Sequence, residues 1–450
     1  IPMGVLGDRI GRRRLLMFGA AAFGCASVLA AFAPSTGALI AARAILGLAA
    51  ATLAPSTLSL IRSMFLDPQQ RTFAIGVWIA SFSAGGAIGP LIGGVMLQYF
   101  WWGSVFLINV PVMVLLLVVG PRLLPEFRDP QAGRPDVLSA SLCIATVLAI
   151  IYGIKHTAEH GADWVAATSI VSGLAIGAIF LRRQRKLAQP FVDLGLFRRV
   201  TFSAALAVNI FGFFVAFGSF LLIAQYFQLV IGLSPLVAGL WSAPSGIAFV
   251  VGAMLTPHIV NRLSPPHLIA TGFVIAALGF GLLTQTGTAH DLAVVATAYA
   301  VFSLGLAPVF TLASDLIVST APPERAGAAA GISEMSAELG GALGIALLGS
   351  VVTMIYRGTA ASAVAANLPP EAVEAARDTL GGALAVAEVL PNPLGAALIS
   401  ASRGAFVEAF QATAVVSAVI ALIAAGATAL LLGRSQRNPA VAPASNGEQR

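Results

Sequence analysis

Residues 4–14 read Gly-Val-Leu-Gly-Asp-Arg-Ile-Gly-Arg-Arg-Arg, and an apolar segment long enough to cross a bilayer follows at once. The stretch sets one carboxylate and four arginines among glycines, which permit a tight turn and a close approach between helices. Arginines beside an apolar segment anchor it at the membrane headgroups. A simple anchor needs charge but no glycines at fixed positions, so the order of residues indicates a loop with a function of its own.

Composition independently indicates a membrane protein. Hydrophobic residues make up 58% of the 450 residues and charged residues 10%, whereas a soluble domain carries about 25% charged residues. The mean hydropathy is +0.91, more apolar surface than a water-soluble fold can hide. The net charge of +6 does not indicate nucleic acid, because the basic residues stand between apolar segments. Cys25 and Cys143 lie within apolar segments and predict neither a disulfide framework nor a metal site.

Twelve apolar segments with short polar joints each predict a membrane-spanning helix of about 20 residues or more. They cover residues 15–33, 38–62, 73–98, 104–121, 137–154, 164–181, 202–229, 236–256, 267–286, 292–314, 327–355 and 406–432. Of the 25 lysines and arginines, 20 fall on one set of alternate joints and four on the other, while Arg43 lies inside a segment. By the positive-inside rule the richer side is cytoplasmic, and an even number of spans places both termini there.

Two joints are longer than the rest. The joint 183–201 is basic and is expected in the cytoplasm, and residues 357–405 are expected as an external loop. Within that loop, Pro369-Pro370-Glu371 predicts the start of a helix over 372–390 that Gly381-Gly382 interrupts. The tail 434–450 is polar and rich in Pro, Ala, Ser and Asn, which predicts disorder.

The opening stretch resembles the loop between the second and third spans in transporters of the major facilitator superfamily, which has the pattern G-x-L-x-D-R-x-G-R-[RK]. The matching residues are Gly4, Leu6, Asp8, Arg9, Gly11, Arg12 and Arg13. The resemblance implies that two spans precede Ile1, so that the intact protein has fourteen. It also implies that this loop gates the cytoplasmic side by latching the two halves while the protein faces outward. The implied gating residues are Gly4, Asp8, Arg9, Gly11, Arg12 and Arg13.

The fold implied by this resemblance is an all-α polytopic membrane protein with two six-helix bundles and two extra central spans. The N-terminal bundle would occupy residues 1–121, and the extra spans with a cytoplasmic linker 122–201. The C-terminal bundle would occupy 202–433 and a cytoplasmic tail 434–450. The expected location is the plasma membrane, here a bacterial inner membrane.

The segment 73–98 contains a Gly-rich pattern with a proline in mid-span. Small residues four apart let helices pack backbone to backbone, and proline kinks a helix. This pattern is compatible with a packing face alone, but the full sequence G-x-x-x-G-P-x-x-G-G resembles the antiporter motif of exporters in this superfamily. The positions that match are Gly85, Gly89, Pro90, Gly93 and Gly94.

Other segments resemble the fourteen-span drug:proton antiporters of that superfamily. Phe106, Asn109 and Pro111 match a W-x-W-x-F-x-I-N-x-P pattern, in which the second tryptophan is shifted here. Gly232-Leu-Ser-Pro235 and Ala321-Pro-Pro-Glu324-Arg325 also resemble that branch. This resemblance implies export of quaternary ammonium compounds, methyl viologen and related lipophilic cations.

Arg43 lies within an apolar segment, where a charge is costly and is usually functional or paired. It matches the superfamily pattern R-x-x-Q-G together with Gly47, although Leu46 stands in place of Gln. The resemblance implies a role in proton coupling. The alternatives are an arginine that snorkels to the interface and one with a structural partner.

Glu334 and Glu338 are the acids of greatest interest for mechanism. Their spacing of four places both on one face of a helix and near mid-membrane. Desolvation and mutual repulsion favour the protonated form, as a proton-coupling or cation site requires. A neutral pair that hydrogen-bonds between helices is the structural alternative. Asp315 near the cytoplasmic end of its segment is a further candidate for proton coupling.

These features predict a proton-coupled multidrug efflux antiporter that exports lipophilic or quaternary ammonium cations by alternating access. The alternative is a narrower proton-coupled exporter of a metabolite, an antibiotic or a siderophore. The five histidines form no ligand cluster with acids inside a segment, and no G-x-x-x-x-G-K-[ST] pattern occurs, so neither an enzyme nor an ATP-driven pump is expected. No cofactor or metal is expected, and the expected partners are drug-like cations, protons and the bilayer around a monomer.

Overall fold

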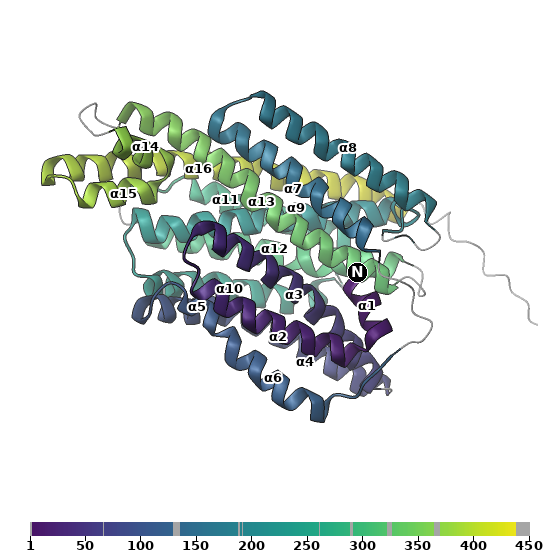
Figure 1. Ribbon diagram of the computed structural model, residues 1–450. Helices are drawn as coiled ribbons and strands as arrows, with labels where there is room; N and C mark the ends of the chain where they lie inside the picture. Colours follow the sequence, from purple (N-terminus) through teal and green to yellow (C-terminus); the bar gives the residue numbers. More distant parts are fainter. Residues whose placement is uncertain are drawn as a thin grey trace, which may run out of the picture. The chain divides into compact units, whose positions relative to one another are not determined.

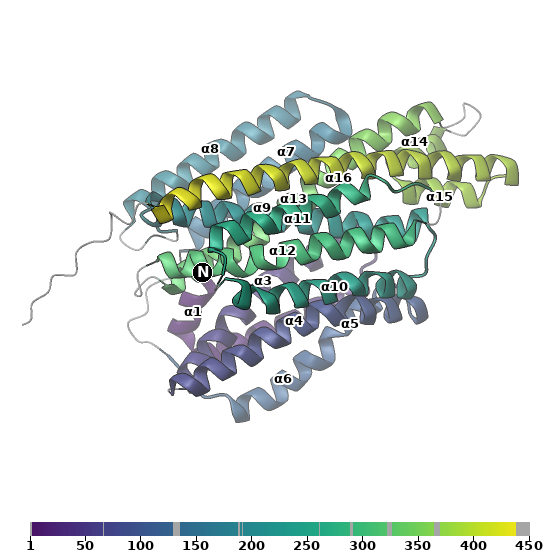
Figure 2. The same cartoon turned by 180° about the vertical axis from the view of Figure 1, so that it is seen from behind.

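The computed structural model describes residues 2–65, 67–128, 136–187, 190, 192–260, 262–288, 291–321, 326–363 and 370–437. In these ranges all regular structure is helical and no strand occurs (Figures 1 and 2). The predicted all-α polytopic class is therefore confirmed. In lipid, a helix is favoured because it pairs its backbone N–H and C=O groups within the segment.

The helices follow one another along the chain with short joints. They are α1 (Pro2–Ile10), α2 (Arg12–Ala31), α3 (Thr36–Met64), α4 (Pro68–Tyr99), α5 (Ser104–Leu107), α6 (Asn109–Leu123), α7 (Val137–His160), α8 (Trp164–Lys186), the short η1 (Leu196–Arg198), α9 (Val200–Gln225), the π-helix η2 (Tyr226–Val230), α10 (Pro235–Ile259), α11 (Pro265–Leu283), α12 (Leu292–Thr320), α13 (Ala326–Ala363), α14 (Pro370–Asp378), α15 (Leu380–Glu388) and α16 (Asn392–Arg437). Each of the twelve predicted spans coincides with one or two of these helices. Within the described ranges, eleven helices are long and apolar enough to cross a membrane, and α4 carries a shorter apolar run, Ile88–Tyr99.

The chain divides into two compact units. The first holds residues 1–144 and 234–243, and the second holds 145–233 and 244–450. The division crosses α10 between Ala243 and Pro244, the first of two prolines inside that helix. The three-part division expected from the sequence, with boundaries after residues 121 and 201, stays a prediction.

The opening segment differs from the tight turn expected over residues 4–14. Residues 2–10 form the helix α1, and the chain changes direction only at Gly11, whose φ is 112°. Gly4 and Gly7 are therefore helical, and a single glycine in the left-handed region makes the break before α2. The side chain of Asp8 lies outside the described part of the molecule.

The segment 357–405, expected as a loop, is largely helical. α13 continues to Ala363, α16 begins at Asn392, and α14 and α15 form a hairpin against the ends of these two helices (Figures 1 and 2). The Ala-rich composition favours continued helix. At a rise of 1.5 Å per residue, the 46 residues of α16 extend for about 69 Å, well beyond a hydrocarbon core of about 30 Å.

The break between α14 and α15 also differs from the expected one. It falls at Thr379, whose hydroxyl accepts the N–H of Gly382 at 3.0 Å, so the pair Gly381-Gly382 lies in the first turn of α15 and does not interrupt a helix. Tyr356 of α13 donates its hydroxyl to the carbonyl of Ala376 at 2.9 Å. Arg357 forms an ion pair with Asp378 at 2.8 Å. These contacts hold the hairpin to the end of α13.

The first residues of the tail expected to be disordered, 434–437, are helical, since α16 continues to Arg437. The rest of that tail, residues 438–450, lies outside the described ranges. The joint 322–325, which contains Glu324 and Arg325, is likewise outside them.

Close backbone contact between α9 and α13 organises the second unit. A Cβ at Gly340 would lie 2.5 Å from the carbonyl oxygen of Ile210, and one at Gly344 would overlap the carbonyl of Phe214. Without a hydrophobic driving force between helices in lipid, such small residues allow the close packing that holds a bundle together. Buried apolar residues at one end of the same pair, among them Phe202 and Ile332, form a core cluster.

We expect Gly340→Leu to destabilise the protein by about 1–3 kcal/mol or to prevent folding, because the new side chain meets backbone rather than a movable side chain. The measurement is the Tm of purified protein in detergent. The matched control is Gly358→Leu on the same helix, where an added Cβ has no neighbour within 4 Å. Equal Tm values for the two variants would contradict the close α9–α13 packing.

Candidate functional site

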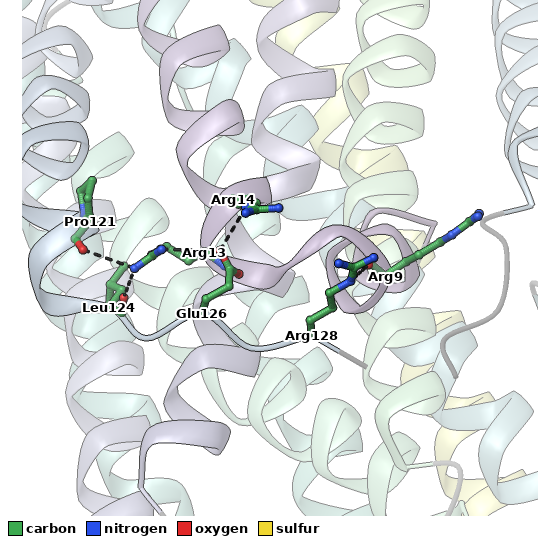
Figure 3. Close-up of polar contacts among 7 residues, drawn as sticks. All are labelled: Arg9, Arg13, Arg14, Pro121, Leu124, Glu126 and Arg128. Atoms are coloured by element: carbon green, nitrogen blue, oxygen red, sulfur yellow. Dashed lines mark hydrogen bonds and ion pairs between the residues drawn. The ribbon is translucent and has the colours of Figure 1, made fainter. Parts of the chain in front are cut away.

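The α1–α2 junction is bound to the segment that follows α6 in the first unit (Figure 3). Glu126 accepts the backbone N–H of Arg13 at 3.2 Å. Its second carboxylate oxygen lies 3.6 Å from Nε of Arg13 and 3.7 Å from Nε of Arg14. The Glu126 carboxylate therefore binds the start of α2, although the two are 113 residues apart in the chain.

Backbone groups extend the same contact on both sides of Glu126. The N–H of Arg12 donates to the carbonyl of Phe127 at 3.0 Å, and Nε of Arg128 donates to the carbonyl of Arg9 at 2.9 Å. The guanidinium of Arg13 also donates to the carbonyl of Leu124 at 3.1 Å, which lies just beyond the end of α6 (Figure 3). Arg13 thus satisfies a carbonyl that the end of the helix leaves without an intrahelical partner.

Two features of the structure require glycine at position 11. Its φ of 112° is one that a residue with a Cβ rarely adopts. A Cβ there would also overlap the Glu126 carboxylate. The glycine of the opening motif is therefore what lets the carboxylate approach the start of α2.

Glu126 was not among the residues singled out from the sequence. The joint that contains it carries both signs of charge, with Asp129 and Asp136 beside three arginines, so the sequence does not mark Glu126 as special. Of the expected gating residues, Arg9, Gly11, Arg12 and Arg13 all take part in the contact. Gly4 lies within α1, and the side chain of Asp8 is outside the described part. Latching of two halves by this loop stays a prediction.

The antiporter motif on α4 contacts the first turns of α10, which belong to the same unit. A Cβ at Gly94 would lie 2.9 Å from the Cα of Leu236, and one at Gly239 would lie 2.8 Å from the carbonyl of Pro90. The two helices therefore meet backbone to backbone at these positions. Gly85 and Gly89 have no such neighbour within 4 Å, so the packing explanation covers only the later part of the motif.

Arg43 is exposed on α3 in the first unit. Its guanidinium lies over the ring of Phe106 at 5.8 Å from the centroid, a cation–π contact. Phe106 in turn packs against the buried cluster that contains Ala42 and Leu46. This contact is compatible both with an Arg43 side chain that snorkels to the membrane interface and with a role of Arg43 in proton coupling.

Glu334 and Glu338 lie on one exposed face of α13, as their spacing predicts. Asp315 is exposed on α12, five residues before that helix ends at Thr320. Among the described residues, no hydrogen bond or ion pair joins Asp315 to either glutamate. The helical face thus brings two of the four predicted coupling residues together, and Arg43 belongs to the other unit.

Asn209 on α9 is a further polar residue beside the glutamates that sequence reasoning missed. It is fully buried, and its amide donates to the carbonyl of Ser333 at 3.1 Å and to the hydroxyl of Ser336 at 2.8 Å. Both serines alternate with the glutamates along α13. The Asn209 amide therefore fixes the turn of α13 that carries the carboxylates.

Two histidines lie in the last turns of α7, beside the joint that leads to α8. His156 lies 3.0 Å from the carboxylate of Asp163, and the rings of His156 and His160 stack at 4.5 Å. The N–H of Ala166, and then His156, lower the pKa of Asp163 below its usual value. No group of three or more His, Cys, Asp or Glu side chains in the described ranges is placed to hold a metal ion.

We expect Glu126→Gln and Arg13→Ala each to lower the Tm, and expect the double variant to lose less than the sum of the two single losses, because the two residues share one ion pair. Exposed ion pairs contribute only about 0.2–1 kcal/mol each, so the effect of a half-buried network should be a few degrees. The measurement is a double-variant cycle on Tm in detergent. Arg9→Ala is the control, since Arg9 contributes its backbone carbonyl. Strictly additive losses for Glu126 and Arg13 would contradict the contact.

Three comparisons with known proteins bear on this arrangement. The family model for the Major Facilitator Superfamily matches residues 1–345. The chain is 41% identical over 434 residues to the multidrug efflux pump LfrA of Mycolicibacterium smegmatis, covering 96% of this chain and 86% of that protein. It is 34% identical over 437 residues to the methyl viologen resistance protein SmvA of Salmonella typhimurium, with the same shares covered.

A solved structure with a similar fold is the bacterial homolog of the human lysosomal transporter Spinster in its inward-facing, unoccupied conformation. The two chains are 18% identical, the TM-score is 0.64, and the alignment covers 96% of this chain and 86% of that one. At this identity the likeness bears on the fold alone. With the family match and the identity to LfrA, it follows that the chain belongs to the major facilitator superfamily: it is a multi-pass membrane transporter and not an enzyme.

Proposed function

We propose that the protein is a proton-coupled multidrug efflux antiporter that exports lipophilic or quaternary ammonium cations by alternating access. The observation that carries the proposal is the pair Glu334 and Glu338 on one exposed face of a membrane-spanning helix. A charged group at this depth is costly unless it serves binding or transport. The names of two relatives, a multidrug efflux pump and a methyl viologen resistance protein, support this substrate class.

The chemistry of exchange follows from two carboxyl groups one helical turn apart. A lipophilic cation with no hydrogen-bond donors binds to a carboxylate through charge and to apolar neighbours through contact area. A proton on the same carboxyl removes that charge and weakens the attraction. Cation and proton therefore compete for one site, and entry of protons on one side releases the cation there.

The Asn209 amide supports this site by holding α13 against α9 where the carboxylates stand. A carboxyl group that binds a cation and a proton in turn needs a helix backbone that stays in place. The two hydrogen bonds from Asn209 to Ser333 and Ser336 hold the backbone of α13 in this way. Arg43 and Asp315 are proposed to take part in proton coupling.

The proposed orientation follows the excess of basic residues at the α1–α2 junction and at the end of α8. By the positive-inside rule these ends face the cytoplasm, so both termini lie there and the α14–α15 hairpin lies outside. The proposed location is a bacterial inner membrane and the proposed state a monomer. In this orientation the contact between Glu126 and the α1–α2 junction lies at the cytoplasmic surface, where a gate belongs.

A narrower exporter is the second candidate. One relative is the tetracenomycin C resistance and export protein of Streptomyces glaucescens, 30% identical over 432 residues, 94% of this chain and 80% of that protein. A single-compound exporter therefore remains compatible with the family, and the range of compounds transported decides between the two.

We expect ethidium to be extruded from cells that lack other pumps and express this protein. We expect either Glu338→Gln or a proton uncoupler to abolish this extrusion. The amide cannot exchange a proton, so cation and proton no longer compete. Glu374→Gln, at an exposed glutamate on α14, is the matched control and should extrude normally. Measurement is ethidium fluorescence over time at equal protein levels.

Ethidium extrusion that survives both Glu338→Gln and the uncoupler would refute proton coupling at this face. Wild-type cells that accumulate ethidium like empty cells, yet resist one compound of a resistance panel, would establish the narrower exporter instead.

A further inference from the structure

We propose that the end of α8, together with the segment that follows it, binds the headgroup of an anionic phospholipid from the adjacent leaflet. Residues 182–199 carry six Lys or Arg and one acid, Asp193, a net charge of +5. They belong to the second unit, and α8 is long and apolar enough to cross a membrane. These charges therefore lie where the span meets the headgroups. The assignment needs only that α8 crosses the bilayer and does not depend on the direction of transport.

The segment after α8 is held against the end of that helix. The side-chain oxygen of Gln184, which is buried, accepts the backbone N–H of Val192 at 3.1 Å. Val192 and Leu196 are buried in the same core cluster against which Phe180 of α8 packs. The short helix η1 ends at Arg198. Cations from two separate stretches of chain are therefore brought to one end of the unit, which a span anchored only by its own last turn does not require.

Most of these cations are exposed and available to a ligand. Arg183 is half-buried, and the guanidinium of Arg199 donates to the carbonyl of Thr320 at the end of α12. Within the part of the chain that the structure describes, four other cations are exposed and have no hydrogen bond or ion pair, namely Arg182, Arg185, Lys186 and Arg198. Like charges that gather without acids repel one another, so a bound anion stabilises the cluster.

One face of α8 joins an apolar track to these cations. Leu174 and Leu181 are 60% and 46% exposed. Spacings of seven and four residues place Leu174, Leu181 and Arg185 on the same face of the helix. An acyl chain can lie along the leucines while its phosphate meets the guanidinium. A free phosphate would use only the cations, so the apolar track favours a lipid.

The chemistry of the cluster selects the headgroup. A guanidinium can donate two parallel N–H groups to the oxygens of one phosphate, and such charge-assisted bonds are the strong ones. Phosphatidylglycerol has a negative phosphate and no cation, whereas the ammonium of phosphatidylethanolamine cancels that charge. The cluster therefore favours the anionic lipid, and it repels the lipophilic cations proposed for the carboxylate face of α13.

The test removes single charges from the two stretches of the cluster. Arg185→Gln changes α8, Arg198→Gln changes η1, and Arg198→Lys keeps the charge at that position. Arg262→Gln is the matched control, because Arg262 is exposed and is the only Lys or Arg between Arg199 and Arg325. Each full chain is purified in detergent and washed free of lipid. It is then titrated with phosphatidylglycerol or with phosphatidylethanolamine of the same acyl chains, and bound lipid is measured by native mass spectrometry.

The wild type is expected to bind phosphatidylglycerol at least tenfold more tightly than phosphatidylethanolamine. Arg185→Gln and Arg198→Gln should each weaken binding of phosphatidylglycerol by about fivefold, which corresponds to about 1 kcal/mol for one cation at a membrane surface. Arg198→Lys and Arg262→Gln should bind as the wild type does. The Tm should not change, because neither Arg185 nor Arg198 has a partner among the described residues.

Three results would overturn the assignment. Equal affinity for the two lipids would show that charge does not select the headgroup. An equal loss in Arg198→Gln and Arg262→Gln would show a general effect of charge and no site. Displacement of phosphatidylglycerol by an equal concentration of inorganic phosphate would show a site for a free anion. Because Arg185 and Arg198 lie in separate stretches, one variant still tests the site if the other fails to fold.

Discussion

The bilayer offers no hydrogen-bond partner to a peptide group, and this constraint governs the rest of the structure. It requires helices whose backbone groups are paired within each span, and it removes the hydrophobic force that would press those helices together. Association then depends on close contact between backbones. Gly340 and Gly344 provide it between α9 and α13, and Gly94 and Gly239 provide it between α4 and α10.

The same constraint explains where polar side chains gather. Inside a span a polar side chain has to find its partner in the protein. Thr256 finds one in its own helix, at the carbonyl of Gly252, and Asn209 finds two in another helix, at Ser333 and Ser336. At the ends of the spans, polar side chains can bind the groups that helix termini leave unpaired. Glu126 and Arg13 do so at the α1–α2 junction. The glutamates of α13 are the exception, since no hydrogen bond or ion pair to them is found among the described residues, and we propose that this suits them to exchange a cation for a proton.

The pattern of apolar residues along the chain predicted the membrane-spanning helices well, because an apolar run of about 20 residues in a membrane forms a helix that crosses it. It predicted helix ends poorly. The Ala-rich stretches around Ala363 and Asn392 carry too little polarity to mark where a span stops, so helix was mistaken for loop. The face shared by Glu334 and Glu338 follows from spacing alone. Glu126 and Asn209 could not be found in this way, because their partners lie 113 and 124 residues away.

Competition between a cation and a proton for Glu334 and Glu338 is the central claim. The most direct measurement is the pH change when tetraphenylphosphonium is added to the purified protein in weakly buffered detergent. We expect protons to be released as the cation binds, and expect Glu334→Gln combined with Glu338→Gln to abolish the release. Cation binding of undiminished affinity without any release of protons would contradict it.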